Sequence, residues 1–366
     1  MRYLGEAAKA AGRDNNFNLV RLGAAFCVLL SHSFTLSTGN ALLEPFRLSA
    51  GISLGSMAVL VFFLTSGYLV GGSLLSRADP VHFTVSRVLR IFPALIVAMT
   101  LTVGLVGPAL SSLSPADFWA DHQTWRYWLT NCVIVFGNDN QLPGLFNGNP
   151  HGSTVNGSLW SISYELWMYG LLVALWAITG GSTNRRRFGA VVAAMVVAAL
   201  AIYLWKGVWE PSSSEVKSKL SWLIPAFFIG SLLYVARARI PLHGAIAAGA
   251  LVLLVVAALI GHRAFALVNL FCFGYLVLYA AYGLPLVRWQ LHADYSYGLY
   301  LYAFLVQQVL ARLVPGIDVL TMTVAATVIT LILAAASWHL VEKRALGAVG
   351  TVAARWSRRQ GRGRPA

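Results

Sequence analysis

Charged residues are scarce in this sequence, and acidic residues are the scarcer kind. Charged residues make up 11% of the 366 positions, with 13 Asp and Glu against 27 Lys and Arg, whereas 58% of the residues are hydrophobic. Soluble domains carry about a quarter charged residues, so this composition predicts an all-α, polytopic membrane protein. The net charge of +14 does not indicate nucleic-acid binding, because the basic residues cluster in short connections and near the C-terminus, as orientation signals do.

Cysteine is also rare, and several catalytic motifs are missing. Cys27, Cys132 and Cys272 match no metal-binding spacing, and we interpret them as packing residues. The sequence has no Walker A lysine motif, no His-Glu-x-x-His and no His-x4-Asp. ATP-driven transport and metal-dependent hydrolysis therefore have no support, and we expect no metal site.

Ten apolar stretches are long enough to cross a membrane as helices. They cover residues 17–37, 53–75, 86–107, 158–179, 187–206, 219–236, 242–261, 264–282, 294–314 and 318–341. The segment before residue 17 does not resemble a signal peptide, so the first stretch is interpreted as a retained span. The apolar stretch at 127–136 is too short to span, and we expect it to be interfacial or re-entrant.

The basic clusters predict the orientation of these spans. Under a ten-span count, the Arg185–Arg187 run falls on the same side as both termini, whereas Asp117, Asp121 and Asp139 fall on the other side. Cytoplasmic connections carry an excess of Lys and Arg. Both termini are therefore predicted to be cytoplasmic, with the protein in the inner (plasma) membrane of a bacterial cell. An odd number of spans would scatter the basic clusters over both sides.

Two segments differ in composition from the spans. Residues 108–157 form the longest connection and are rich in Pro, Gly, Asn and Trp. We interpret this segment either as a lid or substrate-binding element or, equally, as a plain surface loop. Residues 346–366 are basic, and we expect a disordered cytoplasmic tail close to anionic lipid. The remainder, residues 1–345, is predicted to be one membrane domain.

The first span carries two ionisable residues, Arg21 and His32. Eleven helical residues are about three turns, so both side chains share one face and lie about 16 Å apart along the axis. Intramembrane ionisable groups usually face a cavity or a partner, and histidine is the usual general base at neutral pH. The alternatives are a hydrogen-bonded core histidine and an arginine that reaches the headgroups.

Two further segments carry polar side chains at helical spacing. Arg87 and Arg90 share a face at the start of the third span, where a pair of guanidiniums suits phosphate, although orientation alone also explains them. Ser161 and Glu165 belong to a polar stripe near the outer end of the 158–179 span. Glu165 is predicted to share the depth of His32 and to orient its imidazole, and a structural carboxylate is the alternative.

The 294–314 span contributes Ser296 and Tyr300 on one helical face together with Gln307. Its tyrosines are consistent with a pocket lining or with an interfacial belt. His339 and Glu342, at the cytoplasmic end of the last span, are interpreted as structural.

In this order and in a membrane context, these segments resemble the acyltransferase 3 family of integral-membrane O-acyltransferases. Arg21 and His32 match its Arg-x10-His signature, and Arg87, Arg90 and Pro93 match its Arg-x-x-Arg signature. The resemblance extends over roughly residues 14–345 and is to the stand-alone type, without the soluble hydrolase-like domain that some members carry.

Shorter segments add to the resemblance. Residues 62–69 look like the family's "FFxLSGFL" segment, residues 158–165 like "SLWSLxxE" and residues 296–302 like "SYxxYLxH". The histidine of the last segment is missing, because Tyr302, Ala303 and Phe304 occupy that stretch. Glu342 and Lys343 look like the closing "EKP", with Arg344 in place of its proline.

The resemblance implies transfer of an acyl group, commonly acetyl, from cytoplasmic acyl-CoA (acetyl-CoA) to a hydroxyl of a sugar, polysaccharide precursor or glycoside of the cell envelope. His32 would act as base or carry the acyl group transiently, and Glu165 would orient it. The donor would contact Arg21, Arg87 and Arg90, and the acceptor would contact Ser161, Ser296 and Tyr300.

The alternative is a secondary transporter of an anionic or sugar-linked substrate, with Arg, His and Glu as substrate and proton sites. Transporters of that kind often have broken helices at matching positions in two halves, and we find no such pair. A non-catalytic scaffold leaves the co-facial Arg21 and His32 unexplained.

Overall fold

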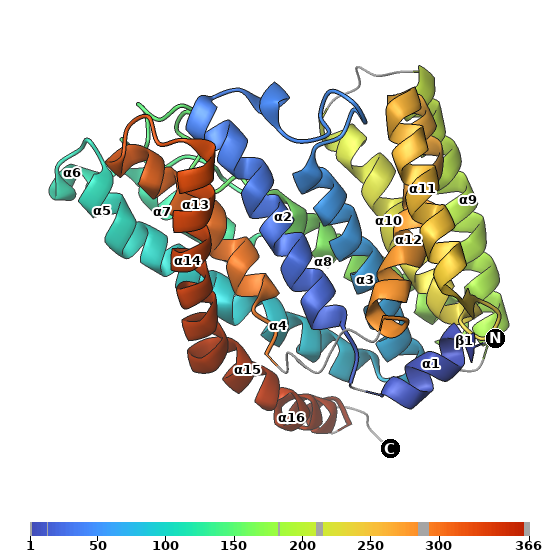
Figure 1. Ribbon diagram of the computed structural model, residues 1–366. Coiled ribbons are helices and arrows are strands. Elements are labelled where there is room, and N and C mark those ends of the chain that lie inside the picture. The colour runs from blue at the N-terminus through green and yellow to red at the C-terminus, as the bar shows by residue number, and fades with distance from the viewer. Residues whose placement is uncertain (1, 13, 182–183, 210–214, 285–292, 362–366) are drawn as a thin grey trace. The chain divides into compact units, whose positions relative to one another are not determined.

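Helices dominate the protein. The computed structural model describes residues 2–12, 14–181, 184–209, 215–284 and 293–361. Its helices are α1 (Leu4–Ala11), α2 (Phe17–Thr38), η1 (Ala41–Leu43), α3 (Leu54–Arg77), α4 (Pro80–Leu101), η2 (Thr102–Val106), α5 (Gly107–Leu110), α6 (Pro115–Ala120), α7 (His122–Val133), α8 (Trp160–Ile178), α9 (Arg185–Trp209), α10 (Glu215–Ala236), α11 (Gly244–Ile260), α12 (His262–Tyr282), α13 (Ser296–Leu313), α14 (Val319–Ser337), η4 (Trp338–Glu342), α15 (Lys343–Gly347) and α16 (Val349–Gly361) (Figure 1). Two short strands, β1 (Arg2–Tyr3) and β2 (Pro241–Leu242), pair antiparallel.

Each of the ten predicted spans contains a long helix. Among the described residues, eight helices are long and apolar enough to cross a membrane. The other two predicted spans correspond to α11, which has 17 residues, and α13, which has 18 residues and is more polar. The prediction of an all-α, multi-pass membrane protein is confirmed, and the count of ten and the side of the termini stay predictions.

Capping residues move some helix ends away from the apolar stretches. The predicted third span begins at residue 86, but α4 begins at Pro80, because the Asp79 side chain accepts a hydrogen bond from the backbone N–H of His82 (2.9 Å). Proline suits this first helical position because it has no N–H to leave unpaired. Asp318 caps α14 in the same way, through the N–H groups of Leu320 and Thr321.

The two segments of unusual composition contain helices. Within residues 108–157, Ser114 caps α6 and Asp121 caps α7, and α7 covers most of the short apolar stretch at 127–136. Disorder is predicted for residues 346–366, but α16 occupies Val349–Gly361. Buried Val349 and Ala353 pack against α4, and this apolar contact stabilises the helix. Residues 362–366 lie outside the described residues.

The described chain divides into two compact units. The first comprises Met1–Val28, Glu44–Ala78 and Tyr164–Asp294, and the second comprises Leu29–Leu43, Asp79–Ser163 and Tyr295–Ala366. The division falls within α2 and within α8, which are both continuous helices.

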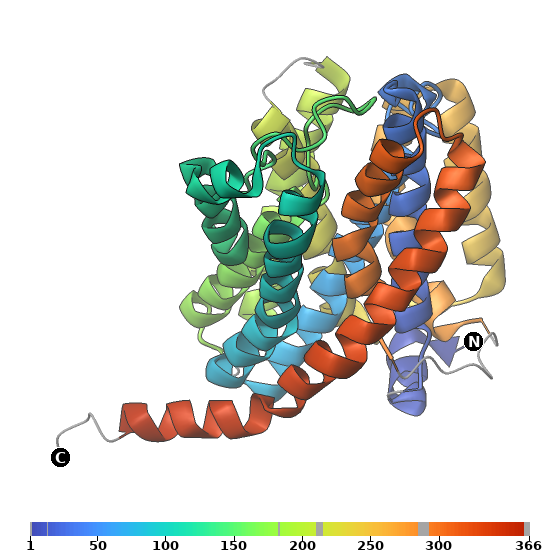
Figure 2. The same cartoon turned by 90° about the vertical axis from the view of Figure 1, so that its left-hand side faces the viewer.

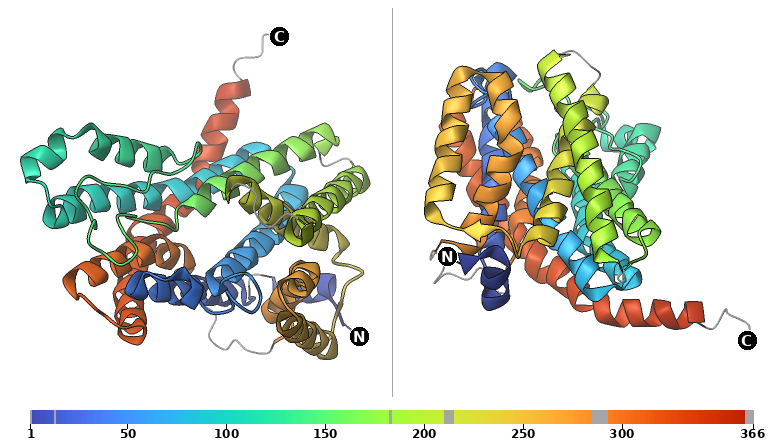
Figure 3. Two further views of the ribbon diagram at one scale, coloured as in Figure 1. Left: turned by 90° about the horizontal axis from the view of Figure 1, so that it is seen from above. Right: turned by 90° about the vertical axis from the view of Figure 1, so that its right-hand side faces the viewer.

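Close helix packing defines the first unit, where α10 packs on α3 and on α9, and α11 packs on α12 (Figure 3). A Cβ at Gly67 of α3 would lie 1.8 Å from the carbonyl oxygen of Phe227, and one at Gly230 of α10 would lie 2.2 Å from that of Leu64. Glycine at both positions lets the α3 and α10 backbones touch, as small residues do in membrane helix pairs.

The second unit is built on the pair of α13 and α14, which lie side by side (Figure 2). A Cβ at Gly298 would lie 2.7 Å from the Cα of Ala334, so glycine is required at this contact. Leu36 of α2 packs with Phe304 of α13 and Met322 of α14 in a buried cluster. The C-terminal half of α2 is thereby held against α13, close to the predicted catalytic histidine.

Candidate active site

His32 lies in the second unit, where α2 meets α13. Its half-buried ring contacts the ring of Phe304 edge to face, with centroids 5.1 Å apart and an interplanar angle of 79°. One turn further along α13, the buried Gln307 amide donates to the carbonyl oxygen of Leu29 (2.9 Å) and to the Ser33 hydroxyl (2.8 Å). The Gln307 amide thus holds the α2 segment that carries His32 against α13, and the imidazole itself contacts the Phe304 ring.

A second histidine, His151, contacts the same phenylalanine. Its ring centroid lies 5.9 Å from that of Phe304, at 68°. The surrounding segment is pinned to α13, because Asn149 donates to the side chain of Gln308 (2.7 Å) and Gln308 donates to the carbonyl oxygen of Thr154 (2.6 Å). Sequence reasoning missed His151, and the one available signal was a histidine within the long 108–157 connection.

The predicted acceptor residues Ser161 and Tyr300 come together in the second unit. Their hydroxyls lie 2.7 Å apart, and the Tyr300 hydroxyl also donates to the carbonyl oxygen of Ser158 (2.8 Å). Ser296, the first residue of α13, is fully buried. The Ser161–Tyr300 bond joins the start of α8 to α13, and the use of these hydroxyls by a substrate stays a prediction.

Arg90, on α4, forms a buried ion pair with Glu342. Its guanidinium Nη1 lies 3.2 Å from Oε2 of Glu342, whose side chain is 1% exposed, and the Ser337 hydroxyl donates to the other carboxylate oxygen (3.0 Å). The guanidinium also lies over the rings of Tyr297 (5.6 Å) and Trp338 (5.8 Å). The π-helical turn η4 carries Trp338 and Glu342, and such turns are frequent at functional sites.

Arg87 lies one turn before Arg90 on α4 and is half-buried. Its Nε donates to the hydroxyl of Ser86 (3.3 Å). Because α4 is helical over both residues, the two guanidiniums share a face as the spacing predicts. Contact of either arginine with a phosphate stays a prediction.

Arg21 lies in the first unit and forms an ion pair with Asp294. The Nη1–Oδ2 distance is 2.6 Å, and the two side chains are 24% and 9% exposed. This charge-assisted bond ties α2 to the residues that precede α13. Arg21 is therefore held by a carboxylate, and its contact with a donor substrate stays a prediction.

Glu165, also in the first unit, accepts hydrogen bonds from two hydroxyls. Ser66 of α3 donates to its Oε1 at 2.9 Å, and Tyr169, one turn further along α8, donates to the same oxygen. The Ser66 and Tyr169 hydroxyls are themselves 3.0 Å apart. Glu165 and His32 belong to different units, so their pairing stays a prediction.

Across the part of the chain that the structure describes, no group of three or more His, Cys, Asp or Glu side chains is arranged to hold a metal ion.

The fold and these residues define a class of protein, namely a multi-pass membrane protein with polar and ionisable side chains within its helices. The Acyltransferase domain model (Acyl_transf_3) matches residues 14–339, and the chain belongs to this acyltransferase family. It is 30% identical over 349 residues to an O-acetyl transferase of Shigella phage Sf6, which covers 91% of this chain and 96% of that protein. It is 28% identical over 379 residues to Nodulation protein 10 of Rhizobium leguminosarum bv. viciae, covering 92% and 94% respectively. No solved structure matches. The protein is therefore an O-acyltransferase.

Proposed function

We propose that the protein transfers an acyl group, acetyl in the first instance, from cytoplasmic acyl-CoA to a hydroxyl of a sugar, polysaccharide precursor or glycoside. The family supports acyl transfer, and the name of the phage relative, O-acetyl transferase, supports acetyl and an oxygen acceptor. The observation that carries the proposal is the half-buried imidazole of His32, which contacts the Phe304 ring and lies on α2 between the two residues that the Gln307 amide binds, Leu29 and Ser33.

His32 performs the chemistry in one of two ways. As a general base, its imidazole takes the proton of the acceptor hydroxyl while that oxygen attacks the thioester carbonyl carbon. The carbon–sulfur bond then breaks, and the departing sulfur takes the proton from the imidazolium, which gives free CoA and an ester. As a nucleophile, the imidazole itself attacks the thioester, releases CoA and then passes the acyl group to the acceptor. Incubation with labelled acyl-CoA without acceptor distinguishes them, because only the second route leaves label on the protein.

The donor is proposed to bind through its phosphates. Arg87 and Arg90 present guanidiniums on one face of α4, and each can grip phosphate oxygens with two hydrogen bonds. Arg90 binds the Glu342 carboxylate through Nη1, and its remaining N–H donors are the ones proposed to contact the phosphate. Arg21, which binds Asp294, is proposed as a further donor contact.

The acceptor is proposed to bind from the opposite side. Ser161, Ser296 and Tyr300 offer hydroxyls that match those of a sugar, and His151 contacts the same Phe304 ring as His32. Glu165, with its two hydroxyl donors, orients or charge-balances the imidazole. This arrangement fits an enzyme of the bacterial inner membrane with cytoplasmic termini, whose product belongs to the cell envelope.

Mass spectrometry of surface glycans and small glycosides tests this proposal, in cells with the gene, without it, and with the His32→Ala variant. We expect a mass increment of one acyl group only with the unaltered gene. Identical spectra from the three strains, with the protein present in the membrane, would contradict acyl transfer to carbohydrate.

A further inference from the structure

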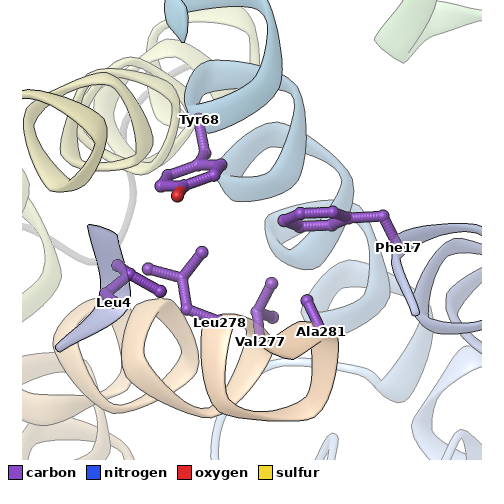
Figure 4. Close-up of a cluster of buried hydrophobic side chains, with 6 residues drawn as sticks. All are labelled: Leu4, Phe17, Tyr68, Val277, Leu278 and Ala281. Atoms are coloured by element: carbon purple, nitrogen blue, oxygen red, sulfur yellow. The ribbon is translucent and has the colours of Figure 1, made fainter. Parts of the chain in front are cut away.

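The N-terminal helix α1 is firmly attached to the first unit. Strand β1 pairs with β2, and the backbone N–H of Gly5 donates to the carbonyl oxygen of Arg237 (2.8 Å). A Cβ at Gly5 would lie 3.4 Å from the same backbone. Leu4 is fully buried in an apolar cluster (Figure 4) whose other buried members are Phe17, Tyr68, Val277, Leu278 and Ala281. Any cavity beside α1 therefore has fixed walls.

Such a cavity, of ≈ 500 Å³, lies between α1 and the ends of α3, α9 and α10. Its lining includes three cationic side chains, Lys9, Arg185 and Arg237, and one acidic side chain, Glu6. Glu6 is already engaged, because its carboxylate accepts the backbone N–H of Tyr3 (3.0 Å). The cavity is therefore positively charged, and fixed cations around a concave wall select an anionic ligand.

Two of the cations are held in place by the protein. The guanidinium of Arg237 lies 3.9 Å from the ring centroid of Tyr234 and donates to the carbonyl oxygen of the same residue (2.7 Å). Arg185, at the start of α9, donates to the carbonyl oxygen of Leu75 (3.0 Å). A guanidinium has five N–H donors, so each retains donors for a ligand. Orientation before binding lowers the entropy lost when a ligand binds.

A second cavity, of ≈ 450 Å³, adjoins the first and shares Gly5, Lys9, Tyr234 and Arg237 with it. Its further lining comes from aromatic and small residues, among them Tyr68, Tyr282 and Gly72. A Cβ at Gly72 would lie 2.5 Å from the Tyr234 ring, so glycine at this position leaves room for the ring that supports Arg237. The paired cavity therefore combines cationic side chains, of which Lys9 and Arg237 line both parts, with the aromatic rings of Tyr68 and Tyr282.

We propose that this paired cavity binds a phosphate group carried by a larger, partly apolar molecule. Phosphate fits because guanidinium forks bind its oxygens with two hydrogen bonds each and lysine adds a point charge. The ligand chemistry has two sources on the side that the basic residues mark as cytoplasmic, the headgroup of an anionic phospholipid and the phosphates of a nucleotide. The proposal of this site does not depend on the function of His32, because the cavity residues belong to the first unit and none of them is proposed to take part in acyl transfer.

The test measures binding of both probes to the full-length protein in neutral detergent. Native mass spectrometry counts bound phosphatidylglycerol, with phosphatidylcholine as the zwitterionic reference, and calorimetry measures adenosine 3′,5′-bisphosphate. The cavity variant is Lys9→Gln, Arg185→Gln, Arg237→Gln. A matched control, Arg186→Gln, Arg187→Gln, Arg239→Gln, removes three exposed cations near the cavity that do not line it.

We expect the cavity variant to lose at least about tenfold in affinity for one probe, whereas the control changes it less than about twofold. The probe that shows this difference identifies the source of the phosphate. Equal losses of affinity in the cavity variant and the control would mean that general surface charge attracts the ligand, and this would overturn the proposal. Failure of both probes to bind the unaltered protein would also overturn it. Arg237→Lys checks folding, and we expect it to retain most of the affinity.

Discussion

Removal of the Glu342 carboxylate is the sharpest perturbation of the second unit. Glu342→Gln keeps the size of the side chain and removes the negative charge that faces the Arg90 guanidinium, which is 12% exposed. Loss of one partner of a buried ion pair costs about 3–5 kcal/mol. The rings of Tyr297 and Trp338 still contact the guanidinium, so we expect the lower end, about 3 kcal/mol of unfolding free energy.

Thermal unfolding in detergent at fixed protein concentration measures this loss. The transition is followed with a fluorescent dye that reports aggregation and does not react with thiols. The matched control is Arg126→Gln, because Arg126 pairs with Asp139 at 3.5 Å with its own side chain 63% exposed. Exposed pairs contribute under about 1 kcal/mol. A double variant, Arg90→Met with Glu342→Met, should recover most of the stability that Glu342→Gln loses. The reasoning is refuted if Glu342→Gln and Arg126→Gln destabilise equally.

Three further predictions concern packing, thiol reactivity and the acceptor. Gly67→Ala should cost at least about 2 kcal/mol of stability in the same unfolding assay, since its Cβ would overlap the Phe227 backbone, whereas Gly23→Ala, with nothing within 4 Å, should not destabilise. Burial raises the pKa of the Cys132 thiol to about 11. In a Cys27→Ala, Cys272→Ala background, alkylation of Cys132 should therefore be slow at pH 8 and accelerate as the pH approaches 11. Rapid alkylation at pH 8 would contradict this. His151→Gln should raise the acceptor KM by about fivefold, the value of one hydrogen bond, and leave the donor KM unchanged. His122→Gln is its control, and an equal rise in the donor KM would remove His151 from the acceptor side.

Long apolar runs made the helices predictable, because burial of apolar surface in lipid depends on composition and length alone. Helix ends were less predictable. The Asp79 cap begins α4 six residues before the predicted span, and apolar packing of Val349 and Ala353 makes a helix of a segment whose composition is typical of disorder.

The partners of the ionisable residues could not be found from local sequence. Arg21 pairs with Asp294 across 273 residues, and Arg90 pairs with Glu342 across 252. Helical spacing identifies residues that share a face of one helix, but it carries no information on which distant helix that face meets. His151 escaped notice for the same reason, since only tertiary packing brings it to Phe304.

The central claim is that His32 carries out acyl transfer, and the most direct measurement is the rate of labelled acetyl transfer from acetyl-CoA to a glycan acceptor by the purified protein. For His32→Ala we predict a loss of at least about a hundredfold, with unchanged thermal unfolding, because a positioned acid–base group contributes about that much or more. A variant that folds as well and transfers acetyl at the unaltered rate would contradict the account.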